Sequence, residues 1–119
     1  MIFSVKHIGQ IIMEDKTQTR RSCEFHTLPR YKVGKTYAIQ SGRGKKALPF
    51  AKIKILDSKL ETENIRVGIS KEDAEAEGGY TPEEFEVLFK EINPRWKARW
   101  AYTFELVIVD TKQSKEEQK

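Results

Sequence analysis

The sequence contains one cysteine, Cys23, among its 119 residues. A single cysteine cannot form an internal disulfide, so the chain fits a reducing, cytoplasmic setting better than the class of disulfide-stabilised secreted domains. Cys23 and His26 have one metal-like spacing, but no second pair completes a set of four ligands. We therefore expect no metal and no cofactor.

Long hydrophobic runs are also missing. The longest apolar stretches, such as LVIVD at 106–110, are far too short to cross a bilayer. The start, MIFSVKHIGQIIMED, has no long apolar segment behind a basic leader, so we expect neither a signal peptide nor a membrane partner. A chain of this length, 38% hydrophobic and 34% charged, is expected to fold as one globular domain.

Acidic residues are scarce in the first half of the chain. Residues 1–56 carry twelve Lys and Arg against three acids, a net charge of +9, and residues 57–119 carry ten against fifteen, a net charge of −5. The two halves together account for the overall +4. A basic half of this kind favours a polyanionic partner, although a solvated face that keeps the protein soluble is the alternative.

Hydrophobic periodicity predicts helices and strands in separate parts of the chain. We expect strands at 2–5, 17–21, 35–40, 48–60, 63–69 and 99–109, and helices at 5–14, 71–77 and 82–92. Helices segregated from several short strands predict an α+β domain, with a small curled sheet or barrel and helices at its side. The polar tail, residues 111–119, is expected to be disordered.

The starts of the last two helices are the clearest local signals. Ser70 can cap the first of them, and Thr81 can cap the second, with Pro82 at its first position and Glu84 completing a capping box. The second helix should bury one apolar stripe made of Phe85, Leu88, Phe89 and Ile92. The last strand should place on one face Trp100, Tyr102, Phe104, Leu106 and Ile108.

The turn SGRGKK at 41–46 is a candidate phosphate-binding segment. It carries Arg43, Lys45 and Lys46 beside glycines that let the backbone approach a ligand. The alternative is a solvated hairpin tip. Bases of a nucleic acid could stack on one or two of the aromatic residues Tyr31, Tyr37, Phe50, Trp96 and Trp100, although most aromatics in such a domain belong to the core.

The segment KTQTRR at 16–21 combines three cations with two hydroxyls. Burial and the neighbouring Arg20 and Arg21 should lower the pKa of Lys16. A neutral lysine can act as a general base, and a threonine such as Thr19 can act as a nucleophile. From the residues alone, phosphate binding by Lys16, Thr17, Arg20 and Arg21 is favoured over covalent catalysis.

Glu77 stands at a helix end, beside Gly78 and Gly79, where the helix dipole disfavours an acid. A charge in such a position often has a distant partner, and Lys16 or Arg21 would serve. The pair could be a structural ion pair or a proton shuttle.

The chain resembles an ASCH domain, a branch of the PUA-like superfamily, over residues 6–109. The segments that carry the resemblance are IIMEDKTQTRR, YKVGKTYAIQSGRGKK, GISKEDAEAEGGYTPEEF and WAYTFELV. The resemblance implies an ASCH domain at residues 1–110, with a small PUA-like β-barrel of mixed strands and peripheral helices. It also implies binding of nucleic acid, RNA or single-stranded DNA, in a cleft beside the barrel.

Some ASCH proteins are amidohydrolases that remove an acyl group from N4-acylated cytidine, and another branch contains ribonucleases. The resemblance to the amidohydrolases implies Lys16 as the base, Thr19 as the nucleophile and Glu77 as the proton donor. The sequence therefore predicts a nucleic-acid-binding domain, with hydrolysis of a modified nucleoside or of RNA as the alternative. A protein-interaction domain that docks through EEFEVLFKEI at 83–92 is a third possibility, and nothing indicates an oligomeric state.

Overall fold

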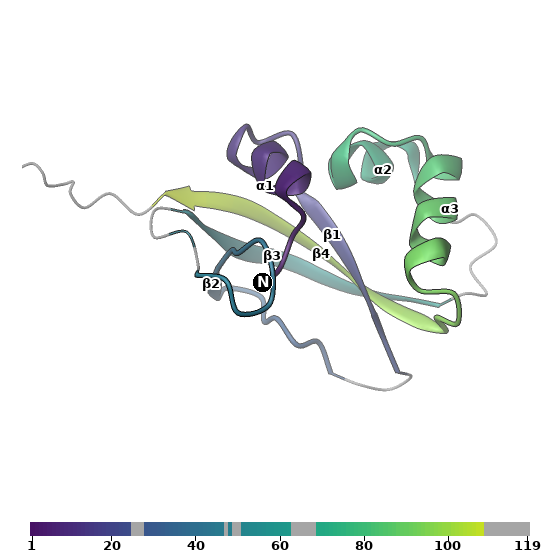
Figure 1. Cartoon of the computed structure of the whole chain (residues 1–119). Helices are drawn as coiled ribbons and strands as arrows, with labels where there is room; N and C mark the ends of the chain where they lie inside the picture. Colours follow the sequence, from purple (N-terminus) through teal and green to yellow (C-terminus); the bar gives the residue numbers. More distant parts are fainter. Residues whose placement is uncertain (25–27, 47, 49–50, 63–68, 109–119) are drawn as a thin grey trace, which may run out of the picture.

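The computed structural model describes residues 1–24, 28–46, 48, 51–62 and 69–108. Within these residues the chain forms three helices and four strands (Figure 1). Their bounds, in chain order, are Val5–Ile12 for α1, Gln18–Cys23 for β1, Thr36–Ala38 for β2, Ala51–Thr62 for β3, Lys71–Gly78 for α2, Pro82–Ile92 for α3 and Ala98–Ile108 for β4. The tail at 111–119 and the strand expected at 63–69, except for Ile69, lie outside the described residues.

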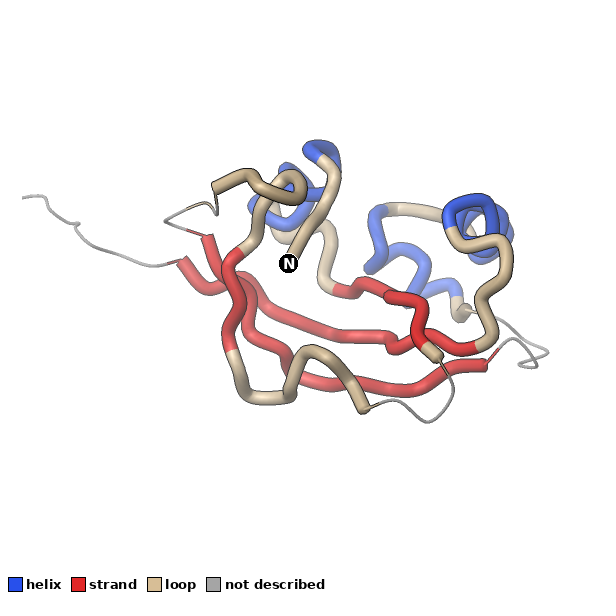
Figure 2. The backbone as a smooth tube through the Cα atoms, turned by 60° about the horizontal axis from the view of Figure 1, so that its bottom comes forward, coloured by secondary structure: helices blue, strands red, loops and turns tan. Residues whose placement is uncertain are grey.

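The four strands form one antiparallel sheet in the order β1-β4-β3-β2. The central pair, β3 and β4, is long and has a bulge between Ile55 and Asp57, which bends the strand. Figures 1 and 2 show a long curved sheet with the three helices on one side of it. No helix in the described part of the chain is long and apolar enough to cross a membrane.

The expected α+β class is confirmed, and the described strands form one antiparallel sheet in which neither the expected mixed pairing nor closure into a barrel is observed. The pairings among the described strands are antiparallel, and the parallel contact between Ile2 and Gln40 is an isolated bridge. The outer edge of the sheet at β1 lies against α2, where the backbone N of Thr17 donates to the carbonyl of Ala76 at 2.8 Å. A helix therefore covers this edge of the sheet.

The helix starts follow the sequence closely. Ser70 caps α2 by accepting from the backbone N of Asp73, and Thr81 and Glu84 form the predicted capping box of α3. The strand expected at 2–5 is not formed, because Ser4 instead caps α1 by accepting from the backbone N of His7 at 3.2 Å.

The hydrophobic interior has two parts. The main cluster joins one face of β3, namely Ala51, Ile53 and Ile55, to Phe3 and Ile11 from the N-terminal segment, with further members from the strands and loops. Ala51, Ile53 and Ile55 thus alternate along β3 with residues that are less buried, as expected for the period of two in a strand.

The second cluster is small and lies under α3. It contains Ile69, Ala74, Phe85 and Phe89. The expected stripe of α3 is only partly buried, since Ile92 remains 69% exposed at the end of the helix.

The last strand is buried on both faces, whereas the sequence predicted one. Tyr102 and Phe104 are buried as expected, and Arg99 and Ala101 are buried on the opposite face. The guanidinium of Arg99 lies 4.8 Å from the ring centre of Phe89 in α3. Packing of α3 accounts for the second buried face.

Candidate functional site

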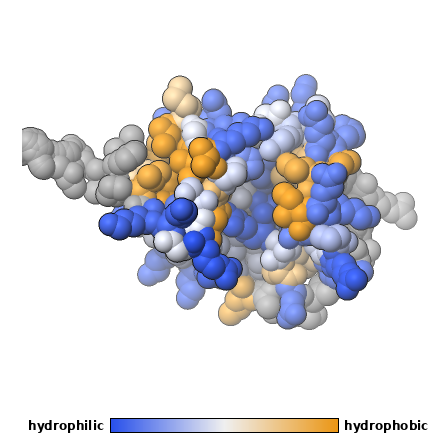
Figure 3. All heavy atoms as spheres, in the orientation of Figure 1, coloured by the Kyte–Doolittle hydropathy of each residue, from blue (hydrophilic) through white to orange (hydrophobic). Residues whose placement is uncertain are grey.

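A cavity of about 960 Å³ lies where α1, α2 and α3 meet β1 and β4. Figure 3 shows a hollow with hydrophilic atoms at its base between two hydrophobic patches of the surface. Five of the predicted site residues line this cavity, namely Lys16, Thr19, Arg20, Arg21 and Glu77. Its volume is in the range of cavities that bind small ligands.

Lys16 and Glu77 form a buried ion pair at the cavity. The Lys16 Nζ donates to the Glu77 backbone carbonyl at 2.6 Å and to Glu77 Oε1 at 3.1 Å, and the two side chains are only 1% and 4% exposed. Burial lowers the pKa of Lys16, opposed by the charge and hydrogen bond of Glu77, while Arg21 and Arg20 lower it further. The sequence left two possible partners for Glu77, namely Lys16 and Arg21, and the structure pairs it with Lys16.

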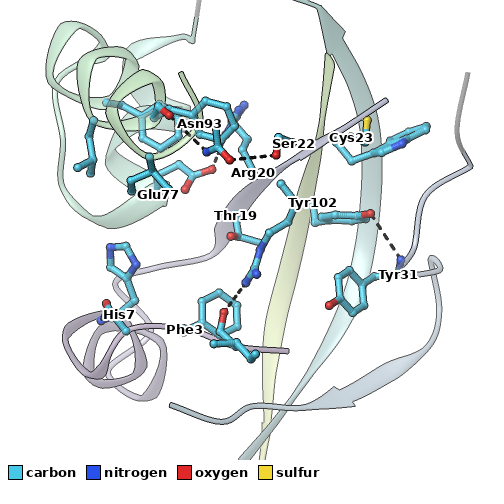
Figure 4. Close-up of a pocket in the computed structure, with 18 of the residues that line it drawn as sticks. Phe3, His7, Thr19, Arg20, Ser22, Cys23, Tyr31, Glu77, Asn93 and Tyr102 are labelled. Atoms are coloured by element: carbon cyan, nitrogen blue, oxygen red, sulfur yellow. Dashed lines mark hydrogen bonds and ion pairs between the residues drawn. The ribbon is translucent and has the colours of Figure 1, made fainter. Parts of the chain in front are cut away.

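Thr19 lies on β1 directly opposite Tyr102 of β4. Its side chain is buried, and Figure 4 shows its hydroxyl facing the space between Glu77 and His7. No hydrogen bond joins this hydroxyl to another group of the described residues. A hydroxyl with free lone pairs and a free proton can therefore meet a ligand in the cavity.

Arg20 points away from Thr19, as expected for its neighbour on a strand, and it is fully occupied by protein groups. Its Nε and Nη2 bind both oxygens of Glu61 at 3.0 Å, and its Nη1 donates to Glu77 Oε2 at 2.9 Å. The remaining donors bind Gln18 and Asp73. Because a guanidinium has five donors and all five are used, Arg20 cannot bind a phosphate without losing a present partner.

Burial by itself would lower the pKa of Arg20, but the hydrogen bonds and charge of Glu61, and then those of Glu77, raise it. Glu61 in turn accepts from Arg99 Nε at 2.8 Å, and the two Nη groups of Arg99 bind Glu86 at 2.8 Å. A chain of alternating negative and positive charges therefore runs from the cavity to α3 through Glu77, Arg20, Glu61, Arg99 and Glu86.

Three charged residues at the site were not expected from the sequence, namely Glu61, Arg99 and Glu86. A charged residue inside a strand is usually exposed, and these charges are buried because the register of β3 and β4 places Glu61 opposite Arg99. That register is not visible from one sequence.

Arg21 has different partners from Arg20. Its guanidinium lies 4.8 Å from the ring centre of Phe3, and its Nη2 donates to the carbonyl of Ile2 at 2.7 Å. Within the described residues it has no carboxylate partner. Burial lowers the pKa of Arg21, and the nearby Tyr31 and Glu77 oppose this effect. The cavity therefore contains a half-buried cation with unused donors.

Tyrosine rings form a second wall of the cavity. The rings of Tyr31 and Tyr102 are 5.5 Å apart in an edge-to-face arrangement, and the Tyr102 hydroxyl accepts from the backbone N of Tyr31 at 3.5 Å (Figure 4). Trp100 also lines the cavity, and the Arg30 guanidinium lies 5.8 Å from the Tyr31 ring centre. Of the stacking candidates, Tyr31 and Trp100 are at the cavity, and Phe50 lies outside the described residues.

His7 was not expected at the site. Its Nε2 is 3.0 Å from the Tyr80 hydroxyl, and this contact joins α1 to the end of α2. Burial lowers the pKa of His7 to about 4, with further lowering by Lys16, Lys6 and Arg21. His7 is therefore neutral at neutral pH and can exchange a hydrogen bond with a ligand or with Tyr80.

Other predicted binding residues lie elsewhere. Thr17 does not line the cavity and contributes backbone hydrogen bonds to Ala76 and Phe104. The cations of the turn, Arg43, Lys45 and Lys46, are exposed and are not part of the cavity wall.

Comparison with solved structures identifies the fold. The chain superposes on the ASCH domain from Lactobacillus crispatus JV V101 with a TM-score of 0.65 and 14% identity, covering 85% of this chain and 70% of that one. It also superposes on a protein of family DUF984 from Enterococcus faecalis V583 with a TM-score of 0.58 and 26% identity, covering 84% and 69%.

The fold is that of an ASCH domain. No protein-family model matches the chain, and no curated protein matches its sequence. Within this ASCH fold, the strand β1 presents Thr19 and Arg21 to the cavity while α2 supplies Glu77. The site thus combines residues that lie more than 50 positions apart in the chain.

Proposed function

We propose that the protein binds RNA, with a phosphate on Arg21 and a base against the tyrosine wall of the cavity. The observation that carries the proposal is the state of Arg21, a half-buried guanidinium that donates to the carbonyl of Ile2 and has no carboxylate partner among the described residues. An unpaired buried cation is costly, and a bound anion would offset that cost.

The charges and rings around Arg21 support the same ligand. Lys6, Lys16 and Arg30 also line the cavity, whereas its acidic residues are Glu24 and Glu77, of which Glu77 is held by Lys16 and Arg20. Cations beside aromatic rings are the combination with which proteins bind single-stranded nucleic acids.

Fluorescence anisotropy with a short labelled RNA tests the proposal. Arg21→Gln keeps a donor for the carbonyl of Ile2 but removes the charge, and we expect it to weaken binding by about tenfold. Arg43→Gln is the matched control, because it makes the same change on the exposed turn outside the cavity. If Arg21→Gln and Arg43→Gln bound RNA with equal affinity, the cavity would not be the binding site. Single-stranded DNA serves as the comparison ligand.

A second candidate function is hydrolysis, which the contact between Lys16 and Glu77 beside the free Thr19 hydroxyl favours. One proton moved from Lys16 to Glu77 gives an amine base and a carboxylic acid. For an N4-acylated cytidine, the amine takes the proton of Thr19, and Thr19 Oγ1 attacks the acyl carbon. The C–N bond breaks, Glu77 protonates the leaving N4 amine, and water hydrolyses the ester on Thr19.

In the ribonuclease alternative, Lys16 takes the proton of a ribose 2′-hydroxyl, which attacks the adjacent phosphorus. The bond to the 5′-oxygen breaks, and Glu77 protonates that oxygen. In this version Thr19 forms no covalent intermediate. The Thr19 hydroxyl is therefore required as the nucleophile in the amidohydrolase reaction but not in the ribonuclease reaction.

Chromatography after incubation with N4-acetylcytidine and with labelled RNA tests both reactions. Lys16→Met should lower either turnover by at least about 100-fold. Thr19→Val should do the same only for the acylated nucleoside, whereas Thr17→Val, a matched change outside the cavity wall, should not. Wild-type turnover that survives in Lys16→Met would exclude both mechanisms.

A further inference from the structure

A second cavity, of about 720 Å³, continues the first. It is formed by the end of β1 and by the connection from α3 to β4, and four of its lining residues also line the first cavity, namely Ser22, Cys23, Glu24 and Asn93. Ser22 Oγ donates to Asn93 Oδ1 at 3.0 Å and so joins these two elements at the boundary (Figure 4). The two cavities therefore adjoin at the end of β1, next to Arg21.

The second cavity has a cation without a carboxylate partner in the described residues. Arg95 is exposed and lines the cavity, and Lys97 lines it as well. Glu24 is the acid of this wall, so the local balance remains positive. A phosphate beside Arg95 would gain a charge-assisted contact.

Trp96 supplies a ring that is fixed in place. The Arg99 guanidinium lies 4.5 Å from the indole centre, and Phe89 meets it edge-to-face at 5.3 Å. The indole is nevertheless only half-buried and lines the second cavity, so part of it faces that space. A ring already held by its neighbours loses little side-chain entropy when a base stacks on it.

We propose that the second cavity binds the neighbouring nucleotide of a single-stranded RNA whose first nucleotide occupies the cavity at Arg21. The proposal rests on the proposed RNA binding and deepens it, because it makes the ligand a chain of two or more nucleotides. A base stacks on Trp96, and its phosphate contacts Arg95. The boundary residues Ser22 and Asn93 lie along the backbone of the bound chain.

Two titrations test this proposal, one with uridine 5′-monophosphate and one with the tetranucleotide of uridine. Binding is followed by changes in NMR chemical shifts, including that of the Trp96 indole N–H. The tetranucleotide should bind wild type at least about tenfold more tightly than the monophosphate, and only the tetranucleotide should shift the Trp96 indole. Arg95→Glu should weaken the tetranucleotide at least about fivefold and leave the monophosphate nearly unchanged. Lys90→Glu is the matched control, since Lys90 is exposed near the end of α3 and lines neither cavity.

Two results overturn the inference while RNA binding stands. One is equal affinity of wild type for the two ligands, and the other is the same loss of tetranucleotide affinity in Arg95→Glu and in Lys90→Glu. If neither ligand binds wild type, and a longer RNA does not bind either, the proposed function fails together with the inference.

Discussion

At the scale of single residues, two adjacent arginines have opposite roles. Arg20 is buried with all five donors bound to protein groups, and Arg21 keeps free donors at the cavity. The step of one residue along a strand turns the side chain to the other face. Arg20 is therefore a positioning residue for Glu77, and Arg21 is a ligand-binding candidate.

Replacing Arg20 tests this difference. Arg20→Lys keeps the charge but cannot reproduce the paired contacts with Glu61 while also reaching Glu77. We expect it to lower the free energy of unfolding by about 3 kcal/mol, measured by urea denaturation. Arg43→Lys on the exposed turn should change it by less than about 0.5 kcal/mol. If Arg20→Lys were as stable as wild type, the ion-pair network would not depend on the two parallel hydrogen bonds of the guanidinium to Glu61.

His7 should make stability depend on pH. The folded protein holds the pKa of His7 at about 4, against an ordinary value of 6.5, so the unfolded chain takes up the proton first. The contribution of neutral His7 is complete above about pH 6.5 and is lost progressively as the pH falls toward 4. The urea concentration at the midpoint of unfolding should therefore decrease as the pH is lowered from 7 to 5. The substitution His7→Gln should make this decrease smaller. An identical pH dependence in both proteins would contradict the lowered pKa of His7.

At the scale of elements, the site combines an edge strand with a short helix. β1 carries Thr19 and Arg21, and α2 covers the edge of β1 and brings Glu77 to Lys16. α3 then fixes the other side of the cavity through Phe85 and Phe89. Loss of either helix would open the site to water.

The capping box should contribute measurably to α3. Thr81→Ala removes the hydroxyl that accepts from the backbone N of Glu84 at 3.1 Å, and we expect it to destabilise the protein by about 1 kcal/mol. Thr81→Ser keeps the hydroxyl and should restore most of the stability. Thermal unfolding followed by circular dichroism compares the two. Equal melting temperatures of wild type and Thr81→Ala would show that packing alone holds α3.

At the scale of the whole molecule, the cavity lies between two hydrophobic clusters, one on the long sheet and one under α3. Helices that pack on separate clusters leave a space between them, and Arg21, which has no carboxylate partner among the described residues, lines this space. The overall charge of +4 adds a weaker attraction for polyanions that is not specific to the cavity.

RNA affinity should therefore fall as salt is added, but with a shallow slope. If Arg21 and Arg95 each hold one phosphate, the logarithm of the association constant should fall with the logarithm of salt with a slope of about −1.4. Arg95→Glu should reduce the magnitude of this slope. A slope near zero would contradict phosphate contacts, and one steeper than about −4 would indicate binding across the wider basic surface.

Local signals in the sequence determined the capped starts of α2 and α3 and the α+β class, because each depends on residues close together in the chain. The pairing of Lys16 with Glu77 was one of two options that the residues left open. Only the tertiary structure separated Arg20 from Arg21, placed Glu61 opposite Arg99 and brought His7 to the cavity. Those outcomes depend on strand register and on which helix covers which edge, and contacts between distant segments decide both.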